Sequence, residues 1–233
     1  MKWLKDLLED FLCLLFPRIC YGCGNHLVRD EYLICTECYV VIPRTNSHTM
    51  KDNPVEQLFY GRCRIESAAA FSYFNKGSRI RKLIHNLKYG GVKEIGRELG
   101  KIYGRSLKSS DFLDGIDLIV PLPLHKSKER ARGFNQSETI ASGISEVTDL
   151  PLITKAIARR TATSTQTKRS RIERWDNVEG IFVVKNPNLL AGKHILLIDD
   201  VITTGATMES CANEILKVEG ARVSLIALAY TPS

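Results

Sequence analysis

The sequence lacks an apolar run long enough to cross a membrane, so no transmembrane span is expected. The N-terminal residues 1–16 come nearest, but Lys5 and three acidic side chains interrupt them. The apolar run that remains, residues 11–16, is also too short for the core of a secretory signal peptide. With neither signal present, we expect a protein of the reducing cytoplasm.

The sequence also lacks the pattern G-x-x-x-x-G-K-[ST], which excludes a P-loop nucleotide hydrolase. It has no internal repeat, which excludes a solenoid or a propeller. Its 44% hydrophobic and 25% charged residues are typical of globular proteins with a packed core. A formal charge of +7 favours phosphate-bearing partners, whether nucleotide or nucleic acid. At 233 residues, we expect one α/β domain and a smaller module.

Residues 1–17 are predicted to form an amphipathic helix. Apolar side chains recur at helical spacing from Trp3 to Leu15, the charged ones fall on the other face, and Pro17 ends the pattern. Two roles remain open for this helix: it docks on its own protein, or it meets a partner or a membrane surface.

Four of the seven cysteines, Cys20, Cys23, Cys35 and Cys38, form the pattern C-x2-C-x11-C-x2-C. Each C-x2-C pair lets a tight turn present two thiolates to one ion, and four thiolates complete the tetrahedral coordination of Zn²⁺. Because no position is left for a catalytic water, we expect a structural zinc finger over residues 18–45. Disulfides or reduced core thiols are the alternative, which a cytoplasmic chain disfavours.

Apolar, strand-like runs alternate with helical patterns from residue 68 to residue 233, which predicts an α/β domain with a mostly parallel sheet flanked by helices. We expect strands at residues 68–74, 116–121, 194–198 and 222–229 and one near Leu152, and helices at residues 79–87, 92–107, 136–147 and 206–218. Residues 46–67 are left as a linker or a hood segment.

Residues 195–207, ILLIDDVITTGAT, are the most informative about chemistry. An apolar strand leads to Asp199 and Asp200, and then through a Thr-rich turn into a helix. At the carboxyl end of a parallel strand, such a turn offers backbone N–H groups and the positive end of a helix to a phosphate. The carboxylates can accept hydrogen bonds from ribose hydroxyls and can meet Mg²⁺. An ordinary Asp cap before a Thr turn explains any one of these features, but not all of them together.

This segment resembles the loop that binds 5-phosphoribosyl-1-pyrophosphate (PRPP) in type I phosphoribosyltransferases. Residues 120–136 (VPLPLHKSKERARGFNQ) and 87–91 (LKYGG), together with the four-cysteine N-terminus, resemble the ComF family of competence-associated proteins. The similarity extends over essentially the whole chain. It implies a type I phosphoribosyltransferase fold behind a structural zinc finger, and a role in handling single-stranded DNA during natural transformation.

Carried onto this sequence, the resemblance implies that Asp199 and Asp200 hold the ribose hydroxyls and that Mg²⁺ accompanies PRPP. The other implied PRPP contacts are Thr203, Thr204, Gly205, Ala206 and Thr207 at the 5-phosphate, Leu122, Pro123, Leu124 and His125 at the pyrophosphate, and Arg130, Arg132 and Lys88 as cations. Lys126 and Lys128, beside Arg130 and Arg132, are also placed to neutralise diphosphate charge, and a solvated surface run is the alternative for at least two of these four. For Lys88 the alternative is an ordinary helix end before Gly90 and Gly91.

Three functions remain open at this point. The first is handling of internalised single-stranded DNA, with a DNA-uptake helicase or another competence protein as partner. The second is a Mg²⁺-dependent phosphoribosyltransferase of unknown acceptor, and the third is a PRPP sensor without catalysis. A basic track for single-stranded DNA would comprise Lys155, Arg159, Arg160, Lys168, Arg169, Arg171 and Arg174, with Trp175 as a stacking platform. A hood over the pocket is the alternative for that stretch.

Overall fold

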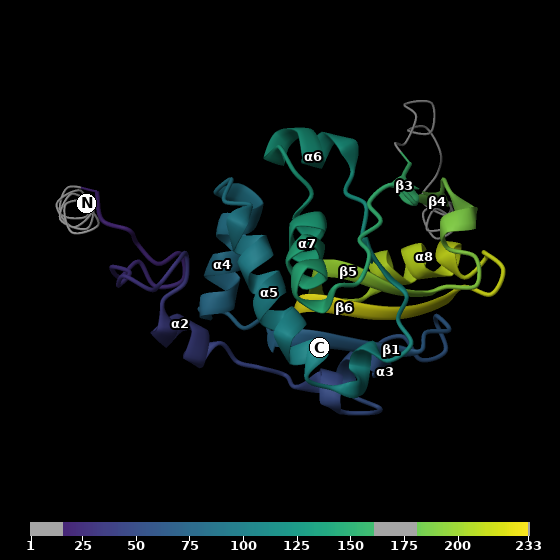
Figure 1. Cartoon of the computed structure of the whole chain (residues 1–233), viewed down its shortest axis with the longest axis horizontal. Coiled ribbons are helices and arrows are strands. Elements are labelled where there is room, and N and C mark those ends of the chain that lie inside the picture. The colour runs from purple at the N-terminus through teal and green to yellow at the C-terminus, as the bar shows by residue number, and fades with distance from the viewer. Residues whose placement is uncertain (1–15, 161–180, 233) are drawn as a thin grey trace, which may run out of the picture.

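A computed structural model describes residues 16–160 and 181–232 of the chain (Figure 1). The protein is built around a four-stranded sheet of β1 (Ser67–Tyr73), β6 (Arg222–Tyr230), β5 (His194–Ile202) and β2 (Leu118–Pro121), in that order. All neighbouring strands in this sheet are parallel. The predicted α/β fold is therefore confirmed, and the carboxyl ends of the strands meet at one edge, where α/β proteins bind ligands.

Both faces of the sheet are covered, as the ribbon shows (Figure 1). The helices packed against the sheet are the short α3 (Pro54–Gln57) and the longer α4 (Arg79–Tyr89), α5 (Glu94–Lys108), α7 (Gln136–Thr148) and α8 (Ala206–Ile215). Alternate residues of β5 enter two cores: Leu196 and Ile198 join that of α4, α5 and α7, while Ile195 and Leu197 join that of α3 and α8. Burial on both faces explains why the strands are continuous apolar runs in the sequence.

Close packing of α5 against α7 fixes one wall of the ligand edge. Gly100 of α5 lies so near α7 that a Cβ there would overlap the carbonyl oxygen of Ile140. With α7 held in this way, its N-cap Asn135 reaches the loop that follows β2 and donates from Nδ2 to the Leu122 carbonyl at 3.0 Å. The two elements that border the pocket from this side are thus bonded to each other.

The remaining elements are short. They are α2 (Thr36–Val41), α6 (Lys126–Arg132), the 3-10 helices η1 (Ser47–Thr49), η2 (Asp111–Leu113) and η6 (Pro187–Leu189), and the antiparallel pair β3 (Ile157–Arg159) and β4 (Phe182–Val184). Within residues 16–160 and 181–232, no helix is both long and apolar enough to cross a membrane.

The predicted helices and strands are largely confirmed, and the differences have physical reasons. Strand β5 does not end before the two carboxylates, because the backbone of Asp199 still pairs with Ala227 of β6 and pairing continues to Ile202. The strand expected near Leu152 is a single bridge to Ile119. Helix α6 and the β3–β4 pair were not predicted, since segments this short give little periodic signal.

Two of the predicted features lie wholly or mostly outside the described residues. One is the N-terminal helix, of which only its last two residues are described. The other is the distal part of the basic track, Lys168, Arg169, Arg171 and Arg174 with Trp175. Both remain predictions.

Candidate functional site

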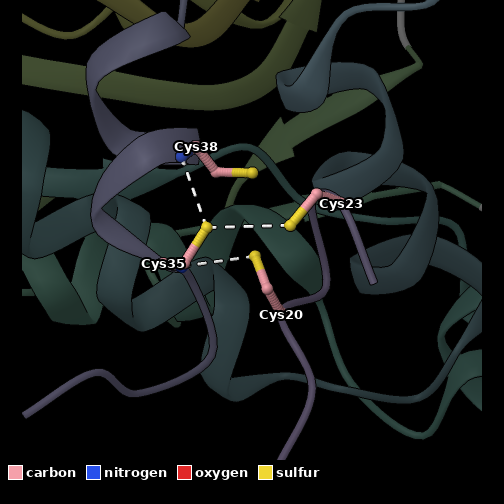
Figure 2. Close-up of side chains that lie close together, drawn as sticks. All are labelled: Cys20, Cys23, Cys35 and Cys38. Atoms are coloured by element: carbon pink, nitrogen blue, oxygen red, sulfur yellow. Dashed lines mark hydrogen bonds between the residues drawn. The ribbon is translucent and has the colours of Figure 1, made fainter. Parts of the chain in front are cut away.

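The four predicted metal ligands Cys20, Cys23, Cys35 and Cys38 form one cluster (Figure 2). Their Sγ atoms all lie within 4.8 Å of one another, and those of Cys23 and Cys35 are 3.7 Å apart. Four sulfurs bound tetrahedrally to zinc at about 2.3 Å lie about 3.8 Å from each other. The cluster therefore has the dimensions of a four-thiolate site and can bind a metal ion such as zinc.

Backbone N–H groups prepare this cluster for negative charge. Gly22 and Cys35 donate their N–H groups to the Sγ of Cys20 at 3.3 and 3.2 Å, and Cys38 donates to the Sγ of Cys35 at 3.4 Å. Burial opposes ionisation of Cys20, but the backbone donors of Cys35, Cys23 and Gly22 outweigh it and lower the pKa of this thiol to about 7. Burial raises the pKa of Cys38, so a cation is needed to hold all four thiolates.

The cysteine module is attached to the α/β domain by apolar packing and by polar contacts, and its buried Cys20, Ile34 and Cys38 belong to the same core as α4 and α5. Asn86 of α4 donates from Nδ2 to the Tyr21 carbonyl at 3.1 Å. The Arg44 guanidinium lies 4.2 Å from the ring centre of Phe71 in β1 and 4.9 Å from that of Tyr39. The hydrogen bond from Asn86 joins the module to α4, whose last turn carries Lys88 at the ligand edge of the sheet.

A cavity of about 460 Å³ lies at the carboxyl ends of β2 and β5. Its lining includes many of the predicted site residues: Lys88, Leu122, Pro123, Leu124, Arg132, Asp199, Asp200, Thr203 and Thr207. These residues come from four separate stretches of the sequence and are brought together by the parallel sheet. The volume lies within the range of small-molecule sites, which is roughly 300–1,000 Å³.

Five of the predicted PRPP contacts do not line this cavity: Thr204, Gly205, Ala206, His125 and Arg130. His125 caps α6 by accepting a hydrogen bond from the Ser127 N–H at 3.3 Å, and Arg130 is exposed on α6. Gly205 is the N-cap of α8, and Ala206 is its first residue. Five lining residues are not among those expected at PRPP: Phe74, Gln136, Ser137, Arg159 and Val201. Lys128, one of the basic residues expected near the diphosphate, also lines the cavity.

Asp199 is held by hydrogen bonds to one of its oxygens. Ser137 Oγ donates to Asp199 Oδ1 at 2.9 Å, and the N–H of Asp200 donates to the same atom at 2.8 Å. Burial, followed by repulsion from the Asp200 carboxylate, raises the pKa of Asp199 from 3.8 to about 7, although both hydrogen bonds and Lys88 act in the opposite direction. The pocket therefore favours a cation or a hydrogen-bond donor beside this carboxyl group.

Asp200 offers a free acceptor atom inside the pocket. Its side chain is only 5% exposed, and its Oδ1 forms an ion pair with Lys88 Nζ at 2.8 Å. Its other oxygen, Oδ2, is buried without a hydrogen-bond partner among the described residues. A buried carboxylate oxygen without a partner is costly, so a bound hydroxyl or metal ion would satisfy an atom that the protein leaves open.

The cavity is positively charged in spite of the two carboxylates. Lys88, Lys128, Arg132 and Arg159 are the four cationic residues of its lining, against Asp199 and Asp200. Arg132 is oriented by Gln136, whose Oε1 accepts a hydrogen bond at 2.6 Å, and by Tyr89, whose ring centre lies 5.4 Å from the guanidinium carbon. An excess of fixed positive charge with a planar donor favours a polyanionic ligand such as a phosphate ester.

Comparison with known proteins first gives the class of the domain. Residues 132–233 match the family described as phosphoribosyl transferase domain, which confirms the expected fold together with the parallel sheet. Among solved structures, a hypoxanthine phosphoribosyl transferase of Trypanosoma cruzi is 12% identical, with a TM-score of 0.38, over 60% of this chain and 76% of that chain. At these values the likeness carries no information about substrate.

Whole-chain relatives then give the family. The chain is 30% identical over 231 residues to the competence protein ComFC of Bacillus subtilis (strain 168), covering 96% of this chain and 90% of that protein. It is 28% identical over 224 residues to the DNA utilization protein YhgH of Escherichia coli (strain K12), covering 91% of this chain and 90% of that protein. The chain belongs to the ComF family of competence proteins, as its motifs predicted.

Proposed function

We propose that this chain binds PRPP with Mg²⁺ in the cavity at the ends of β2 and β5, and that it acts in the handling of DNA. The observation that carries the first part is the buried, unpartnered Oδ2 of Asp200 next to Asp199 in a positively charged pocket. The names of the relatives, a competence protein and a DNA utilization protein, support the second part.

PRPP is a ribose with a phosphate at one end and a diphosphate at the other, and the chain offers groups suited to each of these three parts. In this proposal the ribose hydroxyls meet Asp199 and Asp200, two carboxylates of the cavity lining. The 5-phosphate is placed at residues 203–207, at the N-terminus of α8. The diphosphate is placed at residues 122–124, near Lys128 and Arg132, which also line the cavity.

The residues around Asp200 also fit a magnesium ion. Mg²⁺ is bound in proteins by one or two carboxylates together with phosphate oxygens, and Asp199 and Asp200 are the two carboxylates of this cavity. When bound, Mg²⁺ would neutralise negative charge on the diphosphate. For the cysteine module, zinc is the proposed ion, because four buried or half-buried thiolates satisfy its preferred coordination.

The DNA part of the proposal draws on the described basic residues Lys155, Arg159 and Arg160. Lys155 and Arg160 are exposed, and Arg159 of β3 lines the cavity, so positive charge extends from the pocket to the surface. Contacts of this kind to a phosphate backbone weaken with salt. Fluorescence anisotropy with a labelled single strand should show binding that falls steeply between low and physiological salt. Binding that is absent, or insensitive to salt, would contradict this part.

The PRPP part is tested by calorimetric titration of the zinc-loaded protein with PRPP and Mg²⁺. The wild-type chain should bind, and Asp200→Asn should bind at least about tenfold more weakly, a change of about 1.4 kcal/mol or more. Asp114→Asn is the matched control, because Asp114 is an exposed carboxylate outside the cavity lining. Unchanged affinity in the Asp200 variant would exclude the assignment of this carboxylate.

A further inference from the structure

The proposed phosphate loop, residues 203–207, is contacted from outside the pocket by a residue far away in the sequence. Arg62 Nη1 donates a hydrogen bond to the carbonyl oxygen of Thr204 at 2.9 Å. Its Nη2 pairs with the carboxylate of Glu209, in the first turn of α8. One guanidinium therefore joins the loop to the helix that follows it.

The contact with the Thr204 carbonyl determines which way the loop's next N–H group points. The chain has no cis peptide bond among its described residues, so the peptide from Thr204 to Gly205 is trans and planar. In such a peptide the carbonyl and the N–H point in opposite directions. Because Arg62 holds the carbonyl on its own side, the N–H of Gly205 is directed to the opposite side, as a phosphate at the start of α8 requires.

Phe59 supports the loop next to this contact. Gly205 has a φ of 75°, and a Cβ at this position would lie 2.9 Å from Cε1 of Phe59. Phe59 itself is fully buried, so its ring cannot withdraw without disturbing the core. The loop is therefore in contact with a rigid aromatic ring as well as with Arg62.

The segment that carries Phe59 and Arg62 is itself firmly anchored. Asn53, only 2% exposed, caps α3 and donates from Nδ2 to the carbonyls of Ser47, Met50 and Ala68 at 3.2, 3.1 and 2.9 Å. Arg62 is then held by its own chain, since Nη1 also donates to the Leu58 carbonyl at 2.8 Å. Hydrogen bonds therefore link β1 to residues 53–62 through Asn53, and residues 53–62 to the loop 203–207 through Arg62.

We propose that Arg62 is a positioning residue for the 5-phosphate of PRPP, acting through the Thr204 carbonyl and Glu209. The inference rests on the proposed PRPP site and adds a residue that does not line the cavity. It also gives residues 53–62 a role as a support behind the loop. Lysine cannot replace this guanidinium fully, because a single ammonium group lacks the fork that reaches two partners at once.

The test compares Arg62→Met and Arg62→Lys with the matched control Arg64→Met, since Arg64 is an exposed arginine two residues further along the chain. Affinities for PRPP and for inorganic pyrophosphate, each with Mg²⁺, are measured by calorimetry, and melting temperatures are recorded alongside. We expect Arg62→Met to weaken PRPP binding roughly tenfold, Arg62→Lys to weaken it less, and Arg64→Met to leave it unchanged. Pyrophosphate lacks the 5-phosphate, so its affinity should be the same in all four proteins.

Three results would overturn the inference, and they differ in what they mean for the proposed PRPP site. Equal PRPP affinity in Arg62→Met and wild type would remove the positioning role and leave the proposed PRPP site intact. An equal loss for PRPP and pyrophosphate, with a lowered melting temperature, would mean that Arg62 serves general stability. If wild type itself binds no PRPP, the proposed function fails and the inference fails with it.

Discussion

Replacing Asp199 with asparagine should stabilise the folded protein at neutral pH, because this position carries an unfavourable charge. The pKa of Asp199 is raised from 3.8 to about 7 by burial and by Asp200. The native state therefore keeps a proton on Asp199 between about pH 4 and pH 7 that the unfolded chain has already released. Since the native state binds more protons in this window, the free energy of unfolding of the wild type falls as pH rises through it.

The expected gain in the free energy of unfolding of Asp199→Asn follows from the size of the pKa shift of Asp199. A shift of about three pKa units corresponds to about 4 kcal/mol at pH values above 7. This is an upper limit, because Asp199 is partly exposed, and we expect about 1–3 kcal/mol. Asparagine keeps an Oδ1 acceptor for Ser137 Oγ and for the Asp200 N–H, so the two hydrogen bonds of Asp199 need not be lost.

The assay is urea unfolding of wild type and Asp199→Asn at a series of pH values from 4 to 8.5. The stability difference in favour of the variant should grow from about pH 4 to pH 7 and then stay constant. The exposed control Asp114→Asn should show no such growth. A difference that does not change with pH, or an Asn variant that is less stable at pH 8, would refute the argument.

Three further changes test other parts of the site. Gly205→Ala places a Cβ against the Phe59 ring at a φ of 75°, so urea unfolding should show a stability loss of at least about 1–2 kcal/mol. Unchanged stability would contradict this loop geometry. Lys88→Met removes the ion-pair partner of Asp200, so urea unfolding at pH 7 should show a stability loss of about 1–3 kcal/mol. The loss should be smaller when Lys88→Met is made in the Asp200→Asn variant, and equal losses with and without Asp200→Asn would mean that the two residues are not coupled. Cys38→Ser removes one of the four thiolates, so elemental analysis should find less than one zinc ion per chain and the melting temperature should fall. A full zinc ion per chain in this variant would contradict a four-cysteine site.

The sequence was sufficient to predict the features that depend on local pattern. The apolar runs of β5 and β6 and the spacing of the four cysteines were recognisable because strand burial and tetrahedral thiolate coordination each require a fixed arrangement along the chain. The position of Asp199 and Asp200 toward the carboxyl end of a parallel strand followed from the same pattern, although β5 continues past them to Ile202. That edge is where the structure places the cavity.

The parts of the site that were missed depend on tertiary packing. Ser137 meets Asp199 across 62 residues, and Arg62 meets Thr204 across 142. A serine or an arginine in isolation gives no sequence signal for such a contact. Gln136 is the exception, because it ends the stretch 120–136 that resembled the ComF family and could have been included from that motif.

The most direct test of the proposed PRPP site is a crystal structure of the protein with PRPP and Mg²⁺. We predict the 5-phosphate within hydrogen-bond distance of residues 203–207, the ribose hydroxyls at Asp199 and Asp200, and the diphosphate near Lys128 and Arg132. PRPP bound elsewhere on the protein would contradict the proposed site. So would an empty cavity at saturating PRPP in which Lys88 keeps its ion pair with Asp200.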